Sequence, residues 1–171
     1  MDDVNNALNE LNHYTDKTIY NFTEMTRNIG TFTAAGVDLD ASVTAIKGIA
    51  NLAAVSGSNA TQASTAMYQL SQALASGTVR LQDWLSIEHA GLGGQMFQDV
   101  LKETAREFGV NIDQMIEEEG AFRDTLSKGW LTTDILTTSL AKFTDETTKL
   151  GKTATDAATV VKTFSQLWIL S

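Results

Sequence analysis

A long run without charged side chains, from Gly48 to Val79, is the strongest constraint that this sequence places on its fold. Helices at the surface of a globular protein usually carry charge on the face that meets water. A helical segment without charge must therefore bury both of its faces or meet a partner with one of them. Contact with a partner is an early hypothesis for this part of the chain.

Single glycines separate the apolar segments, and the chain has no proline. Glycine often ends a helix because it enters the left-handed conformation without a Cβ clash. The predicted fold class is all-α, a compact multi-helix bundle of about six to eight helices with glycine-capped turns and longer helices at the two termini. The expected helix stops are Gly30, Gly36, Gly57, Gly77, Gly109, Gly120, Gly129 and Gly151.

Apolar residues recur at spacings of three and four along most of the chain, which predicts amphipathic helices. The first covers residues 1–30 as an N-terminal amphipathic helix or arm, of about seven turns if it is unbroken. Residues 39–145 are the predicted helical core, and residues 152–171 form a C-terminal helix. The apolar stripe of the first helix is Val4, Leu8, Leu11, Tyr14, Thr18, Phe22, Met25 and Ile29.

Two helices of the predicted core carry start signals. Asp40 is the expected N-cap of the first, and Asn59 with Gln62 has the spacing of a capping box for the second. We expect a hairpin whose small residues let the two backbones approach closely. The expected inward residues are Val43, Ile46, Ile49, Leu52 and Ala53 in the first helix and Ala63, Ala66, Met67, Leu70, Ala73 and Leu74 in the second.

Because small residues bury little surface, bulky neighbours must complete the core. Trp84, Met96 and Phe97 are the candidates for this packing. The segment from Gln95 to Phe108 is expected to be a helix that buries Met96, Phe97, Val100, Leu101, Ala105 and Phe108.

Composition restricts the class of protein. The 171 residues, 43% of them hydrophobic, predict one domain. The net charge of −9, with basic residues scattered singly, argues against direct binding of DNA or RNA. No cysteine and no secretory signal are present, which indicates a soluble protein made in a cytoplasm. Polar residues interrupt the charge-free run, so we expect no stable membrane insertion and no binding to neutral liposomes.

The C-terminal residues Leu167 to Leu170 are all large and apolar. An exposed apolar cluster favours association. We therefore expect residues 1–171 to be a single helical module cut from a longer chain, in which the last helix continues.

A small set of residues is assigned a structural or interaction role, and none is assigned to catalysis, a cofactor or a metal. A glycine cluster before a helix can cradle phosphate, but no strand precedes this one and no Lys-Ser or Lys-Thr follows it. Close helix packing at a turn is the preferred interpretation. Tryptophans are most often core or interface anchors; the first two are assigned to the core and the last to an interface. The set is Trp84, Gly91, Gly93, Gly94, Phe97, Trp130 and Trp168.

Two other patterns resemble chemical sites. Asp83, Ser86 and His89 supply an acid, a nucleophile and a base, but side chains three apart on one helix do not converge as a triad does. The run Glu117 to Glu119 cannot close on one metal ion because adjacent helix residues diverge, so solvated charge paired with Arg123 or Lys128 is preferred. We expect the chain not to be an enzyme.

The blocks YQLSQALASG, LQDWLSIEHAGLGGQMFQ, SKGWLT and KTFSQL occur in this order. Over Phe22 to Trp168 the sequence resembles the N-terminal conserved region of the tail tape measure proteins of tailed bacteriophages and prophages. The resemblance implies a virion structural protein, made in the bacterial host, that sets tail tube length during assembly and leaves ahead of the genome. It also implies contacts with tail tube and tail assembly chaperone proteins, and self-association in the tail.

An alternative class is a helical effector or secretion substrate of bacteria without enzymatic activity. Such proteins are also acidic, free of cysteine and rich in helical hairpins. Their usual Trp-x-Gly hairpin turn is absent here, where Gly129 precedes Trp130.

Overall fold

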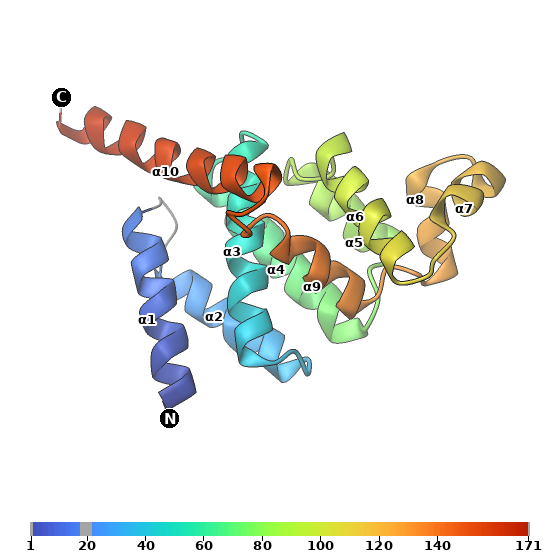
Figure 1. The fold of residues 1–171 in the computed structure, drawn as a ribbon, viewed down its shortest axis with the longest axis horizontal. Coiled ribbons are helices and arrows are strands. Elements are labelled where there is room, and N and C mark those ends of the chain that lie inside the picture. Colours follow the sequence, from blue (N-terminus) through green and yellow to red (C-terminus); the bar gives the residue numbers. More distant parts are fainter. Residues whose placement is uncertain (1, 18–21, 171) are drawn as a thin grey trace.

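The computed structural model describes the backbone of residues 2–17 and 22–170, and the side chains of 15–24, 60 and 160–171 lie outside the described part. The described residues form ten α-helices and a short 3₁₀ helix, more helices than expected, with no named strand (Figure 1). The helices are α1 Asp2–Lys17, α2 Phe22–Ala34, α3 Leu39–Val55, α4 Ala60–Ser76, α5 Leu81–His89, α6 Gln95–Glu107, α7 Ile112–Glu119, α8 Phe122–Thr125, η1 Leu126–Lys128, α9 Thr133–Ala141 and α10 Lys149–Leu170.

Helix α3 lies at the centre of the fold and contacts α1, α2, α4, α9 and α10 (Figure 1). Every residue from Gly48 to Ala54 is buried, which a helix achieves only when neighbours cover all of its sides. The predicted inward residues of α3 are buried as expected. The part of the charge-free run that lies in α3, from Gly48 to Ala54, therefore hides both of its faces inside the protein.

Helix α4 carries the second half of the charge-free run and is covered on one side only. Its predicted inward stripe is buried against α2, α3 and α5. The capping box is confirmed, because the Gln62 backbone N–H donates to Asn59 Oδ1 at 2.8 Å and the Asn59 N–H donates to Gln62 Oε1 at 2.9 Å. The sequence predicted both the start and the buried face of this helix.

A close backbone approach joins α3 to α9. A Cβ atom placed at Gly48 would overlap the carbonyl oxygen of Leu140 and lie 2.7 Å from its carbonyl carbon. Only a residue without a side chain fits this position. The small residues of α3 therefore serve contacts with a helix far along the chain as well as with its hairpin neighbour.

Helices α5 to α8 form the right-hand part of the molecule in Figure 1. Helix α5 contacts α4, and α6 contacts α9. An antiparallel bridge between Thr78 and Thr132 joins the α4–α5 turn to the start of α9, where the Val79 N–H donates to the Leu131 carbonyl oxygen at 2.9 Å. These contacts attach the right-hand helices to the body around α3.

One continuous helix over residues 1–30 is wrong. The described chain has two helices here, α1 and α2, which contact each other and α3. Leu11 and Met25 are both buried because the two segments pack separately. Thr18 and the side chain of Phe22 lie outside the described residues.

Two of the expected glycine stops and one expected cap are also wrong. Gly30 lies inside α2, which continues to Ala34, and Gly151 lies inside α10. At Gly151 the missing side chain makes room for the preceding turn, since a Cβ there would lie 2.7 Å from the Asp145 nitrogen. The N-cap of α3 is Asp38, whose carboxylate accepts the Ala41 N–H at 2.8 Å, and Asp40 lies in the first turn.

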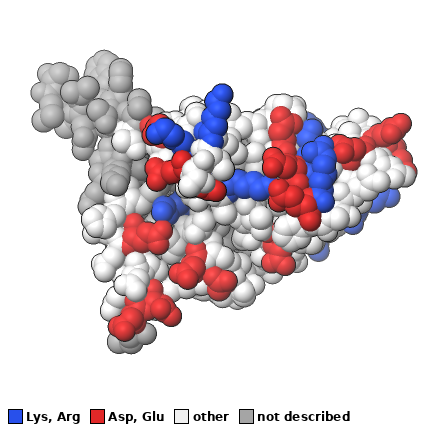
Figure 2. All heavy atoms as spheres, in the orientation of Figure 1, with Lys and Arg blue, Asp and Glu red and all other residues white. Residues whose placement is uncertain are grey.

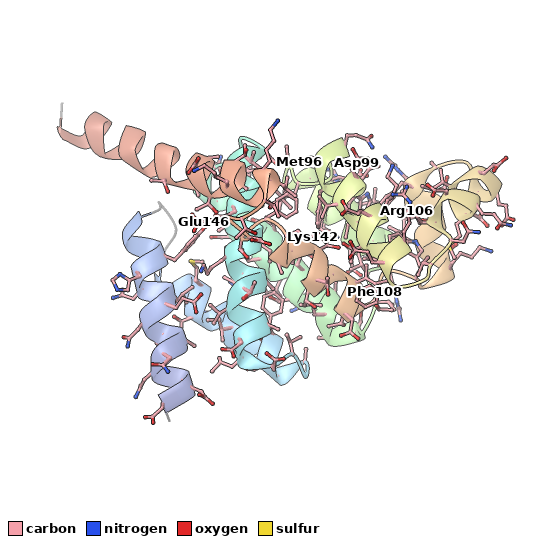
Figure 3. All side chains as sticks on the ribbon, viewed as in Figure 1. Met96, Asp99, Arg106, Phe108, Lys142 and Glu146 are labelled. Atoms are coloured by element: carbon pink, nitrogen blue, oxygen red, sulfur yellow. The ribbon has the colours of Figure 1, made fainter. Side chains whose placement is uncertain are left out.

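Met96 and Phe108 are not in the core, against expectation; their side chains are 41% and 48% exposed. Met96 lies in the first turn of α6 and Phe108 follows its last residue, so the two lie at opposite ends of this helix (Figure 3). The buried face of α6 is Phe97, Val100, Leu101, Thr104 and Ala105.

Candidate functional site

Trp84, Phe97 and Trp130 belong to one aromatic cluster between α5, α6, α8 and the segment before α9. The Trp84 ring centroid lies 5.8 Å from that of Phe97 and 5.0 Å from that of Phe122. Phe122 contacts Trp130 edge to face at 5.8 Å. All four side chains are at most 8% exposed. The cluster fills the interior and offers no open face on which a ligand could stack.

The polar ends of the two tryptophans differ. Trp130 Nε1 donates to Thr125 Oγ1 at 2.9 Å, and Thr125 Oγ1 donates to the Phe122 carbonyl oxygen at 2.6 Å. Trp84 Nε1 is buried and has no hydrogen-bond partner among the described residues. The side chain of Trp168 lies outside the described residues, so its assignment to an interface stays a prediction.

The glycine turn after α5 is closed by packing. Gly91 has φ +84°, and the next N–H, of Leu92, donates to the Ile87 carbonyl oxygen at 3.1 Å, which is the Schellman end of a helix. A Cβ at Gly93 would lie 3.0 Å from Glu88 Cα, and nothing lies within 4 Å of one at Gly94. Gly91 thus ends the helix and Gly93 allows close packing against Glu88, whereas the position of Gly94 is open.

The acid, nucleophile and base of α5 do not converge. The Asp83 carboxylate accepts the Arg80 N–H at 2.9 Å and so caps the helix. Ser86 Oγ donates to the Gln82 carbonyl oxygen at 3.3 Å. His89 lines a separate groove with Ser86, between α4 and α5.

The glutamates of α7 are held by solvent-exposed contacts. Glu119 pairs with Lys128 at 3.1 Å, and Glu118 accepts from Gln114 at 2.9 Å. Arg123 pairs instead with Glu88 of α5 at 3.4 Å. Among the described residues, no group of three or more His, Cys, Asp or Glu side chains is placed to hold a metal ion.

A buried polar junction around Asn51 was not predicted as a site. Tyr14 Oη donates to Asn51 Oδ1 at 2.7 Å, and Asn51 Nδ2 donates to the Phe143 carbonyl oxygen at 2.9 Å and to Thr155 Oγ1 at 3.1 Å. Asn51 is 1% exposed. These bonds join α1, α3, the end of α9 and α10. The only signal in the sequence was an asparagine within an apolar stripe.

A cleft of about 260 Å³ opens over this junction, between α1, α3 and the α9–α10 turn. Lys47 Nζ pairs with Glu10 at 2.9 Å and lies 5.7 Å from the centre of the Tyr14 ring. His13 and Glu146 also line the cleft. The ion pair and the ring contact together hold α1 against the central helix.

Helix α6 carries a charged outer face whose pairs reach α7 and α9. Lys142 Nζ lies 2.9 Å from Glu107 and 3.6 Å from Glu103 (Figure 3). Arg106 donates to both carboxylate oxygens of Asp113, at 2.9 and 2.7 Å, and these hydrogen bonds hold the pKa of Asp113 below its ordinary value. Figure 2 shows acidic and basic side chains side by side over this region.

Comparison with known proteins shows which family this chain belongs to. A family model described as "Tape measure protein" matches residues 1–169. The chain belongs to the tape measure protein family. Family membership confirms the resemblance carried by the sequence blocks and implies a component of the phage tail. This tape measure chain matches no curated protein and no solved structure. In the part that the structure describes, no helix of this tape measure chain combines the length and the apolar character needed to cross a bilayer.

Proposed function

We propose that this chain is a folded assembly module of a phage tail tape measure protein. The parent protein sets the length of the tail tube during assembly and leaves the tube ahead of the genome at infection. The module docks and holds the parent chain in register, while other segments act as the ruler. The match of the tape measure family over residues 1–169 carries this proposal.

The helix lengths support a docking role for this chain over a role as the ruler that sets tail length. A ruler needs long uninterrupted helix, and 171 residues in one continuous helix would reach about 260 Å. The longest described helix, α10 with 22 residues, spans about 33 Å. Helices α1, α2, α4 and α9 pack around α3. The aromatic cluster and the Asn51 junction link segments far apart in the sequence.

The proposed partners are the tail tube and tail assembly chaperone proteins, together with further copies of the chain. Synthesis takes place in the cytoplasm of the bacterial host. We propose a structural role without enzymatic activity, supported by the Asp83 carboxylate, which accepts the Arg80 N–H as a helix cap while Ser86 and His89 line a groove without it. The purified chain is therefore expected to give no peptidoglycan hydrolysis.

Tail length tests the proposal in a phage whose tape measure protein contains this chain. A helix-forming insertion of about 20 residues is placed between Gly120 and Ala121, which are both exposed. If the module stays folded and acts outside the ruler, tails measured by electron microscopy keep their length. If these residues are part of the ruler, tails grow by about 30 Å, and the proposal is wrong.

The matched control is a helical insertion of the same size in the ruler segment of that protein. It is expected to lengthen tails by about 30 Å, which establishes that the measurement detects a change of this size.

A further inference from the structure

Helix α4 belongs to the charge-free run, and the core covers only its inner face. Its outer face is exposed. From residue 61 to residue 75 its exposed residues follow one another at spacings of four and three along one side of the helix, over about 20 Å. Tyr68 lies in the middle of this stripe, and its side chain is 58% exposed. The outer face of α4 consists of Thr61, Thr65, Tyr68, Gln72, Ala75 and Ser76.

A groove of about 260 Å³ runs beside this face, between α4 and α5. Neither the groove nor the outer face of α4 contains an Asp, Glu, Lys or Arg residue. Every other α-helix of the described chain carries at least one of these residues. The groove is lined by Thr61, Gln62, Thr65, Gln69, Ser86, His89 and Ala90.

We propose that the outer face of α4 pairs with the same face of a second copy of this chain, about a two-fold axis. With a net charge of −9, two copies repel each other wherever their acidic surfaces meet. The outer face of α4 is a surface on which they meet without opposing like charges. Its threonine, serine and alanine side chains are small, so two helices can approach closely there.

A two-fold axis gives Tyr68 a defined position. In an antiparallel pair with the axis between Thr65 and Tyr68, the Tyr68 ring of each copy faces Thr65 and the groove of the other. The groove offers apolar surface for the ring and polar groups of Gln69 and Ser86 for its hydroxyl. Each such contact occurs twice, so one substitution alters two sites in the dimer.

This inference rests on the self-association proposed above and specifies its surface. It is measured on the chain alone in solution, whereas the proposed function is measured as tail length. Failure of one experiment is therefore distinguishable from failure of the other.

Sedimentation velocity over a range of concentrations tests the pairing. The wild-type chain is expected to form a dimer as its concentration rises. Tyr68→Glu places two carboxylates in the interface and is expected to weaken dimerisation at least tenfold. Met96→Glu is the matched control, since it adds the same charge at an exposed apolar residue of α6 and is expected to leave the dimer intact. Far-UV circular dichroism checks that both variants fold.

Cross-linking and charge pairing locate the contact. Because the chain has no cysteine, oxidation of a mixture of Thr65→Cys and Tyr68→Cys is expected to give a disulfide-linked dimer, whereas Met96→Cys is expected to form no disulfide-linked dimer. Mixing Tyr68→Glu with Thr65→Lys is expected to restore association between the two variants. A wild-type chain that is monomeric throughout, or a dimer equally sensitive to both glutamate variants, would overturn the proposal. Association only with a different protein through this face would overturn it as well.

Discussion

Gly48→Ala is the sharpest test of how the helices pack. The added methyl group would overlap the Leu140 carbonyl oxygen and lie 2.7 Å from the Leu140 carbonyl carbon. Carbon atoms in contact prefer a separation of about 3.5–4.0 Å, so α3 and α9 would have to move apart by about 1 Å. The obstacle is backbone, and no change of rotamer relieves it.

The expected loss follows from two opposing terms. Overpacking a core costs about 1–3 kcal/mol, and a clash with backbone belongs at the upper end, about 3 kcal/mol. Alanine is a better helix former than glycine by about 1 kcal/mol. The free energy of unfolding should therefore fall by about 2 kcal/mol, which lowers the melting temperature of a domain of this size by about 4–8 °C.

Gly30→Ala is the matched control, because it makes the same substitution inside α2. A Cβ there has nothing within 4 Å, so only the helix propensity changes and stability should rise by about 0.5–1 kcal/mol. Urea unfolding followed by far-UV circular dichroism measures both variants. A Gly48→Ala protein as stable as the wild type would refute the direct contact between α3 and the α9 backbone.

Two further perturbations probe polar contacts. Asn51→Ala removes the hydrogen bonds to Tyr14, Phe143 and Thr155 and should lower the free energy of unfolding, measured in urea, by about 2–3 kcal/mol. Tyr14→Phe removes one of these bonds and should lower it by about 1 kcal/mol. A larger loss for Tyr14→Phe than for Asn51→Ala would contradict the central role of Asn51. Asp113→Asn tests pH dependence. Because hydrogen bonds from the Arg106 guanidinium lower the Asp113 pKa below 3.8, the pair stabilises the fold above that pH, and the stabilisation is lost as the pH falls through the lowered pKa. In thermal melts at neutral pH, the wild type should therefore have a higher melting temperature than Asp113→Asn, and this difference should disappear below about pH 4. A difference in melting temperature that is unchanged at low pH would show that the Asp113 carboxylate does not cause it.

The sequence predicted local features well where they depend on residues within one or two helical turns. The capping box of α4, the buried stripes of α3 and α4 and the all-helical class follow from spacing alone. It failed for α1 and α2, which the spacing of apolar residues does not separate, and at Met96 and Phe108, which lie at the two ends of α6 and are exposed. Of the candidate residues, Trp84, Phe97 and Trp130 are brought into one cluster that no spacing in the sequence indicated.

The Asn51 junction shows the limit most clearly. Asn51 bonds to groups 92 and 104 residues away, so its role depends on where α9 and α10 pack. Sequence spacing shows only that a polar residue interrupts an apolar stripe. The same holds for the charge-free run, for which the sequence left burial and partner contact as alternatives.

By itself the sequence determined the helical class, the start of α4 and the family, because periodicity, capping and ordered motifs are properties of neighbouring residues. Tertiary structure alone decided which faces are covered. It placed Gly48 against the Leu140 backbone, closed α1 over Asn51 and left the outer side of α4 exposed. These contacts join residues far apart in the chain, and their energies depend on the packing of whole helices, which local patterns do not specify.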